Sequence, residues 1–183
     1  MSTIQIAVVV GSLRRDSFNR QLANAITALA PADVSFAQLQ IGDLPLYNKD
    51  DDGQQSAPVL RLKAQIAAAQ GLLFVTPEYN RSIPGVLKNA LDQASRPYGH
   101  SAWAGKPAGI LGVSVGAIGT AMAQQHLRNV LAYLDMPTLA QPEAFIHAKP
   151  GLFNADGSVG GDSKAFLQGW LDHYLAWVRQ RAG

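Results

Sequence analysis

The sequence predicts an α/β protein with a doubly wound parallel sheet, because three features agree. Short apolar runs alternate along the chain with segments of helical spacing, and this alternation is typical of parallel strands joined by crossover helices. The loops that follow the apolar runs are rich in Gly, Ser and Pro. The 183 residues are 48% hydrophobic, which suits a single domain over residues 1–183 with a substantial core.

The beginning of the chain predicts one strand–helix–strand unit. Residues 4–10 form an apolar run that stops at Gly11 and predict a buried strand. Residues 18–30 place their apolar side chains on one helical stripe, and residues 34–39 alternate in polarity like a second strand. The helical segment is long enough to connect two parallel strands.

The middle of the chain repeats this pattern. Residues 42–56 contain proline, glycine and three consecutive aspartates, so we expect an exposed loop before a helix at about residues 58–69. Residues 71–76 predict a third strand, and residues 84–95 predict a helix with proline at its first position. Residues 107–113 predict a fourth strand.

The last third of the chain predicts two more helices and one more strand. Residues 118–134 have helical spacing, and a fifth strand or extended segment is expected around residues 137–146. The last helix begins near Asp162 or Ser163, either of which is a good N-cap. The side chains expected to face the sheet from it are Phe166, Leu167, Trp170, Leu171, Tyr174, Leu175 and Val178.

The composition excludes several classes of function. The chain has no cysteine, so disulfides, thiolate nucleophiles and Cys-ligated metals are absent and any redox activity needs a cofactor. The four histidines are dispersed without the spacing of metal ligands, so we expect no metal site. The net charge is +2 and the basic residues are scattered, which argues against nucleic acid as a partner.

Charge content and the N-terminal residues bear on assembly and location. Only 15% of the residues are charged, which suggests that partner subunits cover part of the surface and favours a homo-oligomer. The apolar run at residues 4–10 is too short for a membrane span, and no basic segment precedes it. We therefore expect a cytoplasmic protein that is not inserted in a membrane.

The loop at residues 11–19, with the sequence GSLRRDSFN, is a candidate phosphate site. It follows a strand and opens a helix, and it offers hydroxyls, an amide, an arginine and the first helical N–H groups. The dinucleotide pattern G-x-G-x-x-G and the triphosphate pattern G-K-[ST] are both missing, so a mononucleotide fits better. The alternative is that Asp16 or Ser17 merely caps the helix.

Two further loops follow strands three and four. Residues 76–85, TPEYNRSIPG, carry a proline near each end, so a stiff backbone could present N–H and C=O groups to a planar heterocycle. The alternative is an ordinary connection in which Asn80 makes the turn. Residues 114–120 follow the fourth strand, and ligands of doubly wound sheets bind beyond the carboxyl ends of the strands.

The patterns G-S-x-R-x-x-S-x-N and P-E-Y-N-x-S-x-P-G-x-x-K-N-A together resemble the NADPH-dependent FMN reductase family. The resemblance extends through residues 104–107, 126–128 and 142–143 and covers most of the chain. It implies a flavodoxin-like fold, in which a five-stranded parallel sheet of order 2-1-3-4-5 carries helices on both faces. It also implies FMN as cofactor, NAD(P)H as electron donor, and a homodimer or homotetramer with the site near a subunit boundary.

The resemblance assigns a role to each loop. The first loop would hold the FMN phosphate, the second would border the isoalloxazine ring, and the third would touch the cofactor as well. The expected cofactor contacts are Ser12, Arg14, Ser17, Phe18, Asn19, Pro77, Glu78, Tyr79, Asn80, Ser114 and Gly116. Arg81 and Gln125 depart from the family pattern, because relatives often have an aromatic residue at the first position and some have tyrosine at the second.

The activity expected from this resemblance is the reduction of small acceptors by NAD(P)H. Quinones, free flavin, chromate, azo compounds and ferric complexes are all possible acceptors. Hydride transfer from the nicotinamide to the flavin, followed by exchange of the nicotinamide for the acceptor, would give a ping-pong reaction. The flavin carries the chemistry, so we expect no catalytic side chain. The Glu78 carboxylate is expected either to have a structural role or to face a neighbouring subunit.

Two other functions are compatible with parts of the sequence. Residues 112–116 match G-x-S-x-G, which offers Ser114 as a nucleophile. Asp135 or Asp156, followed by His173, completes the chain order of an α/β-hydrolase triad. The chain is short for that fold and has no HGGG-type oxyanion segment. A flavodoxin-type electron carrier is the second alternative, although such carriers are usually strongly acidic and this chain has a net charge of +2.

Overall fold

The computed structural model describes residues 3–182 and contains a five-stranded sheet in the order β2-β1-β3-β4-β5. All four strand pairs are parallel. The strands are β1 (Ile4–Val10), β2 (Val34–Gln38), β3 (Gly71–Val75), β4 (Ala108–Ser114) and β5 (Phe145–His147). The predicted fold class and the strand order that the family resemblance implied are both confirmed.

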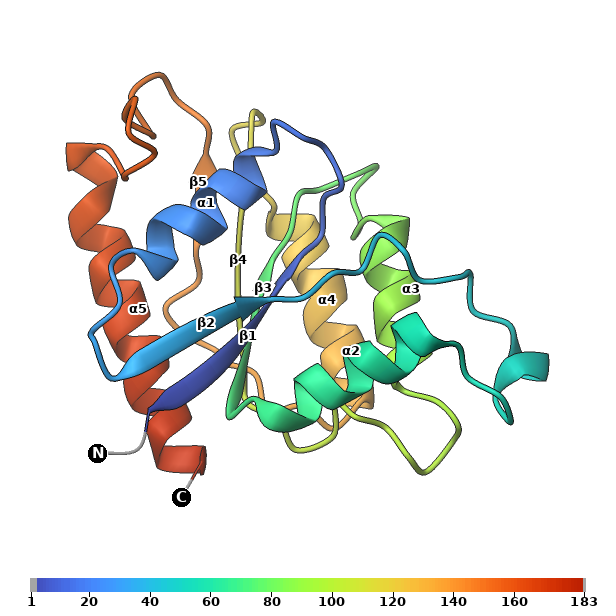
Figure 1. Ribbon diagram of the computed structural model, residues 1–183. Helices are drawn as coiled ribbons and strands as arrows, with labels where there is room; N and C mark the ends of the chain where they lie inside the picture. The colour runs from blue at the N-terminus through green and yellow to red at the C-terminus, as the bar shows by residue number, and fades with distance from the viewer. Residues whose placement is uncertain (1–2, 183) are drawn as a thin grey trace.

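Helices cover both faces of this sheet (Figure 1). They are α1 (Phe18–Thr27), α2 (Ala57–Ala68), α3 (Gly85–Ala94), α4 (Ala121–Tyr133) and α5 (Gly161–Ala182), with a short 3₁₀ helix η1 (Lys49–Asp51) before α2. In Figure 1, α1 and α5 lie on one face, and α2, α3 and α4 lie on the other. This is the doubly wound arrangement that the alternating sequence pattern predicts.

Each face of the sheet has its own hydrophobic core. The core under α1 and α5 includes Ile6, Val8, Leu22, Trp170 and Tyr174. The core under the other three helices includes Ala7, Val9, Leu62, Leu87 and Leu127. Successive residues of β1 thus enter opposite cores, because side chains alternate along a strand, and this explains why a strand buried on both faces reads as a continuous apolar run.

The structure corrects three predictions: the extent of the fifth strand, the start of α4 and the orientation of one side chain on α5. The fifth strand is far shorter than residues 137–146, because Pro137 and Pro142 lack an N–H for the ladder. Before β5 begins, the segment meets β4 at the Ala108–Thr138 bridge and again where the Ala144 carbonyl accepts from the Gly112 N–H. Helix α4 begins three residues later than expected, after Gly119 at a φ of 61°. Phe166 on α5 is 45% exposed and is not part of the core that it was expected to join.

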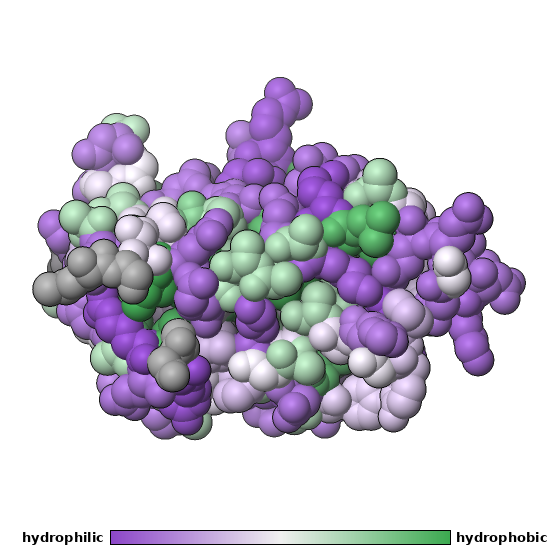
Figure 2. All heavy atoms as spheres, turned by 60° about the horizontal axis from the view of Figure 1, so that its bottom comes forward, coloured by the Kyte–Doolittle hydropathy of each residue, from purple (hydrophilic) through white to green (hydrophobic). Residues whose placement is uncertain are grey.

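The parallel strands direct the three candidate loops to one edge of the sheet. The loops after β1, β3 and β4 lie together along the upper edge in Figure 1, and the two chain ends lie at the opposite side. Figure 2, which turns the lower side forward, shows a mosaic of hydrophilic and apolar groups there. Within residues 3–182, none of the helices combines the length and the apolar character that crossing a membrane requires.

Candidate functional site

A pocket of about 200 Å³ opens at the carboxyl ends of β1, β3 and β4. Its lining comes from all three candidate loops and consists of Ser12, Arg14, Ser17, Phe18, Asn19, Pro77, Glu78, Tyr79, Val113, Ser114 and Val115. Every expected cofactor contact except Asn80 and Gly116 is therefore brought to one place. Val113 and Val115 are additional lining residues that were not predicted, because the motif of the third loop indicated only Ser114 and Gly116.

The first loop is organised by short-range hydrogen bonds. The hydroxyl of Ser17 accepts a hydrogen bond from the Arg20 N–H at 3.3 Å and caps α1, as the simpler alternative proposed. The Ser12 hydroxyl accepts one from the Arg14 N–H at 3.4 Å. Both serines are almost fully buried, whereas Arg14 is exposed. Helix α1 has no acidic residue in its first turn, so its N-terminus remains attractive to an anion.

Gly11 is required by the close approach of two loops. Its N–H donates to the carbonyl of Val75 at 2.9 Å, at the end of β3. A Cβ atom built on Gly11 would lie 2.9 Å from the hydroxyl of Thr76 and 3.4 Å from Pro77. The first loop therefore leaves β1 in direct contact with the start of the second loop, which only a residue without a side chain allows.

Asn19 has a structural partner in this arrangement. Its side-chain amide donates to the Val113 carbonyl at 2.8 Å, and its side-chain oxygen accepts from the Val113 N–H at 3.0 Å. The residue is 97% buried, with only 3% of its surface exposed. These two bonds join the first turn of α1 to the end of β4, so Asn19 aligns the first loop with the third.

The second loop contains a tight two-residue turn. Tyr79 and Ser82 exchange both backbone hydrogen bonds at 3.0 Å, and Asn80 and Arg81 between them have φ values of 51° and 65°. Positive φ at both central positions is the geometry of a type I′ hairpin turn. Asn is common in such turns, but a left-handed conformation at Arg81 is sterically unfavourable because its Cβ comes close to the following carbonyl oxygen. The turn leaves Tyr79 half-exposed beside the pocket.

The Glu78 carboxylate contacts the start of α4. Its Oε2 atom accepts hydrogen bonds from the backbone N–H groups of Met122 at 3.0 Å and Ala123 at 3.1 Å. Four residues farther along the second loop, the hydroxyl of Ser82 lies 2.9 Å from Nδ1 of His126. The side chain of Glu78 is thus engaged by a helix terminus, in agreement with the structural role expected for it.

The third loop is shaped mainly by its own backbone. The Ser114 hydroxyl accepts a hydrogen bond from the Gly116 N–H at 2.9 Å, and the ring of His147 lies 3.1 Å from the Val115 carbonyl. Among the described residues, the hydroxyl of Ser114 has no histidine partner. His173 lies on α5 and does not line the pocket. The Ser-His pair that a hydrolase needs is therefore not assembled.

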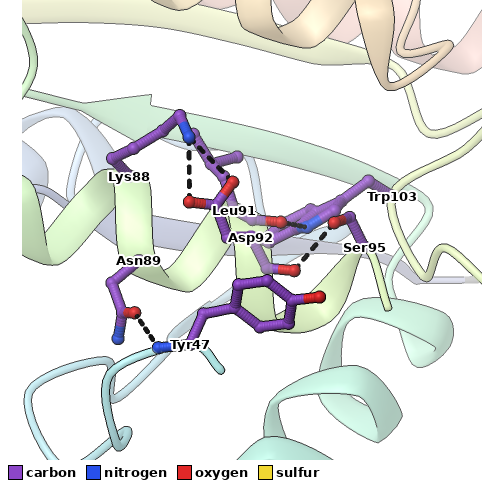
Figure 3. A network of polar contacts seen from close by, with 7 residues as sticks. All are labelled: Tyr47, Lys88, Asn89, Leu91, Asp92, Ser95 and Trp103. Carbon is purple, nitrogen blue, oxygen red and sulfur yellow. Dashed lines mark hydrogen bonds and ion pairs between the residues drawn. The ribbon is translucent and has the colours of Figure 1, made fainter. Parts of the chain in front are cut away.

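Helix α3, which begins where the second loop ends, is anchored at several points (Figure 3). The Asn89 side chain accepts from the Tyr47 N–H at 2.8 Å and donates to the Pro45 carbonyl at 2.8 Å. The indole of Trp103 donates to the Leu91 carbonyl at 3.0 Å. These contacts, which tie α3 to the loop after β2 and to the segment before β4, fix the exit of the second loop.

Tyr98 and Trp103, the two large aromatic residues in the segment between α3 and β4, do not line the pocket. Trp103 is completely buried and packs against Phe74 in the core. Tyr98 is exposed and lines a different hollow together with Tyr133, where α3 and α4 end. No group of three potential metal-ligating side chains occurs within residues 3–182 either.

Comparison with known proteins decides which family this pocket represents. The profile of the NADPH-dependent FMN reductases matches residues 4–151. The chain belongs to this family. It is accordingly an oxidoreductase that uses FMN as its cofactor and NAD(P)H as its electron donor.

Individual FMN reductase relatives match almost the whole chain. A 2-hydroxy-1,4-benzoquinone reductase from a Burkholderia species is 58% identical over 179 residues, which are 97% of this chain and 98% of the relative. A quinone reductase from Pseudomonas putida is 46% identical over 95% of this chain and 94% of its own. The solved structure of FerB, a flavoenzyme NAD(P)H:(acceptor) oxidoreductase from Paracoccus denitrificans, has 44% identity and a TM-score of 0.93, covering 98% of this chain and 99% of its own.

The donors of the pocket fit FMN. A phosphate monoester carries nearly two negative charges and accepts several hydrogen bonds. At one end, the pocket provides two buried hydroxyls, one arginine and the N-terminus of a helix whose first turn has no acidic residue. The other end is bordered by apolar and backbone groups of the second and third loops, which suits a planar ring system.

Proposed function

We propose that this FMN reductase transfers electrons from NAD(P)H to quinones and similar small planar acceptors at the pocket beyond β1, β3 and β4. The observation that carries the proposal is that three loops, far apart in the sequence, line one pocket whose donors suit a flavin mononucleotide. Two close relatives, a 2-hydroxy-1,4-benzoquinone reductase and a quinone reductase, support a quinone as the acceptor.

The first loop would hold the phosphate. The N–H groups at the start of α1 and the guanidinium of Arg14 would supply charge-assisted hydrogen bonds. The hydroxyls of Ser12 and Ser17 lie beside them in the pocket lining and would complete the donor set. Phe18 would border the same end, and Asn19 would keep it aligned with β4 through its bonds to Val113.

The second and third loops would border the ring. Backbone groups of Pro77 to Asn80 and of Ser114 to Gly116 are the candidates for hydrogen bonds to its polar edge. When bound, FMN supplies the two-electron chemistry. No side chain needs to act as acid or base, and the Glu78 carboxylate is already engaged by the start of α4.

The open side of the pocket lies between two exposed side chains, and the space between them would admit one small molecule at a time. Tyr79 is 47% exposed and Val115 is 72% exposed, and both line the pocket. A nicotinamide and then an acceptor would bind in turn between them, so we expect ping-pong kinetics. Chromate, azo compounds, ferric complexes and free flavin are further acceptors that an accessible reduced flavin can serve.

We also propose a homodimer or homotetramer in the cytoplasm. Ile118 and Met122 are both more than two-fifths exposed on the segment that enters α4, next to the pocket. Exposed apolar side chains beside a site are typical of surfaces that another subunit covers. Sedimentation of the purified protein would distinguish a monomer, a dimer and a tetramer.

The function can be tested with the purified protein. We expect a bound yellow flavin that is released as FMN, bleaching by NAD(P)H in the absence of acceptor, and parallel lines in double-reciprocal plots with 1,4-benzoquinone. A protein that neither retains nor binds FMN would contradict the proposal. Bleaching that requires the acceptor to be present first would contradict the ping-pong order.

A further inference from the structure

We propose that Glu78 is a positioning residue that holds the second and third loops at a set spacing by binding the N-terminus of α4. The inference rests on the proposed binding of FMN in this pocket and extends it. Glu78 would not touch the reacting atoms. It would determine instead how well the ring end of the pocket is formed, independently of the phosphate end.

Helix α4 depends on this carboxylate because it has no cap of its own. The side chain of its N-cap residue, Thr120, makes no capping hydrogen bond, and its first turn contains no acidic residue. The Thr120 hydroxyl accepts a hydrogen bond from the Gln124 side chain at 3.0 Å instead. Exposed N–H groups at a helix start need acceptors, and a negative charge is favoured there. Glu78 supplies both to Met122 and Ala123.

The bond crosses between two walls of the pocket. Glu78 and Tyr79 belong to the wall that follows β3, whereas the end of β4 and Val115 after it form the wall that leads towards α4. Glu78 and its two partners are separated by 44 and 45 residues in the chain. The contact therefore restrains the distance between the walls, which neither loop could do through its local hydrogen bonds.

A second contact attaches the other side of the hairpin turn to α4. The Ser82 hydroxyl lies 2.9 Å from Nδ1 of His126, one helical turn beyond Met122 on α4. The hairpin turn of Asn80 and Arg81 lies between these two attachments to α4. Tyr79 and Asn80, which would border the ring, are thereby held along α4 at both ends of the turn.

The phosphate end and the ring end of the pocket are organised by different hydrogen bonds. The first loop is organised by Ser12, Ser17 and Asn19, and none of their hydrogen bonds involves Glu78. Loss of the carboxylate should therefore weaken the binding of riboflavin and of FMN by the same factor. Loss of Arg14 should weaken the binding of FMN alone, because riboflavin has no phosphate.

The experiment measures the dissociation constants of FMN and riboflavin for the flavin-free full-length chain, by quenching of flavin fluorescence. For Glu78→Gln we expect both constants to rise about tenfold with their ratio unchanged, because a neutral amide is a weaker acceptor at a helix N-terminus. Arg14→Ala is the matched control, and its FMN constant should rise while its riboflavin constant stays the same.

A double variant separates positioning of the loop from stability of the helix. Ala121 is the first residue of α4, and Ala121→Asp places a carboxylate at the helix start without connecting it to the second loop. Glu78→Gln should lower the melting temperature, because it weakens the cap of α4. In Glu78→Gln/Ala121→Asp we expect the melting temperature to return to the parent value, while the dissociation constant of riboflavin stays about tenfold above the parent value. Recovery of both would overturn the inference and leave Glu78 as a helix cap only.

The remaining outcomes are also decisive. If the parent protein binds flavin and Glu78→Gln binds it equally well, the inference is wrong while the proposed function stands. If the parent protein binds no flavin, the proposed function fails and the inference fails with it. Should Glu78→Gln not fold, Ser82→Ala cuts the second attachment and should raise both constants by a common factor of a few; unchanged constants would then overturn the inference.

Discussion

The first and second loops of the pocket reach their conformations in different ways. The first is organised over short distances, by Ser12 with Arg14 and by Ser17 with Arg20. The second depends on distant segments, because Glu78 and Ser82 bind α4 more than 40 residues away. The local bonds of the first loop can thus be understood from its own sequence. The second loop and the Asn19–Val113 contact of the first need the assembled fold, and substitutions should distinguish these contributions.

The largest effect is expected where the second and third loops approach each other through β4. A Cβ on Gly112 would overlap the carbonyl oxygen of Thr76 and the hydroxyl of Thr120. Gly112→Ala should lower the free energy of unfolding by about 3 kcal/mol, because a backbone atom cannot yield as a flexible side chain can. Urea unfolding measures this. Gly53→Ala is the control, since nothing lies within 4 Å of a Cβ there, and equal losses in both variants would contradict the prediction.

The next effect concerns the pair of long-range hydrogen bonds that the Asn19 side chain makes. Asn19→Ala removes both hydrogen bonds to Val113 and leaves a buried N–H and a buried carbonyl without partners. We expect a loss of about 2 kcal/mol in the free energy of unfolding. Asn24→Ala is the control on the same helix, because its side chain bonds to Gln38 at an exposed position. A loss below that of the control would show that Asn19 does not align the loop.

A smaller effect is expected from the local cap of the first loop. Ser17→Ala removes the side-chain acceptor for the Arg20 N–H, which should cost about 1 kcal/mol of stability. It should also weaken FMN more than riboflavin, because the hydroxyl lies at the proposed phosphate end. Thermal melts and flavin titrations measure the two effects. If the losses for FMN and riboflavin were equal, Ser17 would be a cap without a role in phosphate binding.

The smallest effect is a gain in stability in the second loop. Arg81 has a φ of 65°, and glycine adopts this region without the steric cost of a Cβ. Arg81→Gly should therefore raise the free energy of unfolding by roughly 0.5–1 kcal/mol. Arg81→Ala is the control, because it removes the guanidinium and keeps the Cβ. A similar gain in both variants would attribute the effect to charge and not to backbone strain.

Much of the fold follows from local properties of the sequence. The apolar run of β1 identifies that strand to the residue, and the alternation of strands and helices predicts the parallel sheet. These features are readable because the burial pattern and the caps depend on neighbouring residues. The motifs of the first two loops likewise predicted most of the pocket lining, since the carboxyl ends of parallel strands meet at one edge of the sheet.

The tertiary structure decided what depends on partners far along the chain. The fifth strand is short because strand pairing needs a neighbour, and the segment before it leaves β4. Asn19 and Glu78 carry polar groups that suit a ligand, yet their side chains bind Val113 and the start of α4. A buried polar group binds whichever partner the fold brings within reach, and a sequence motif states only what the group can donate or accept.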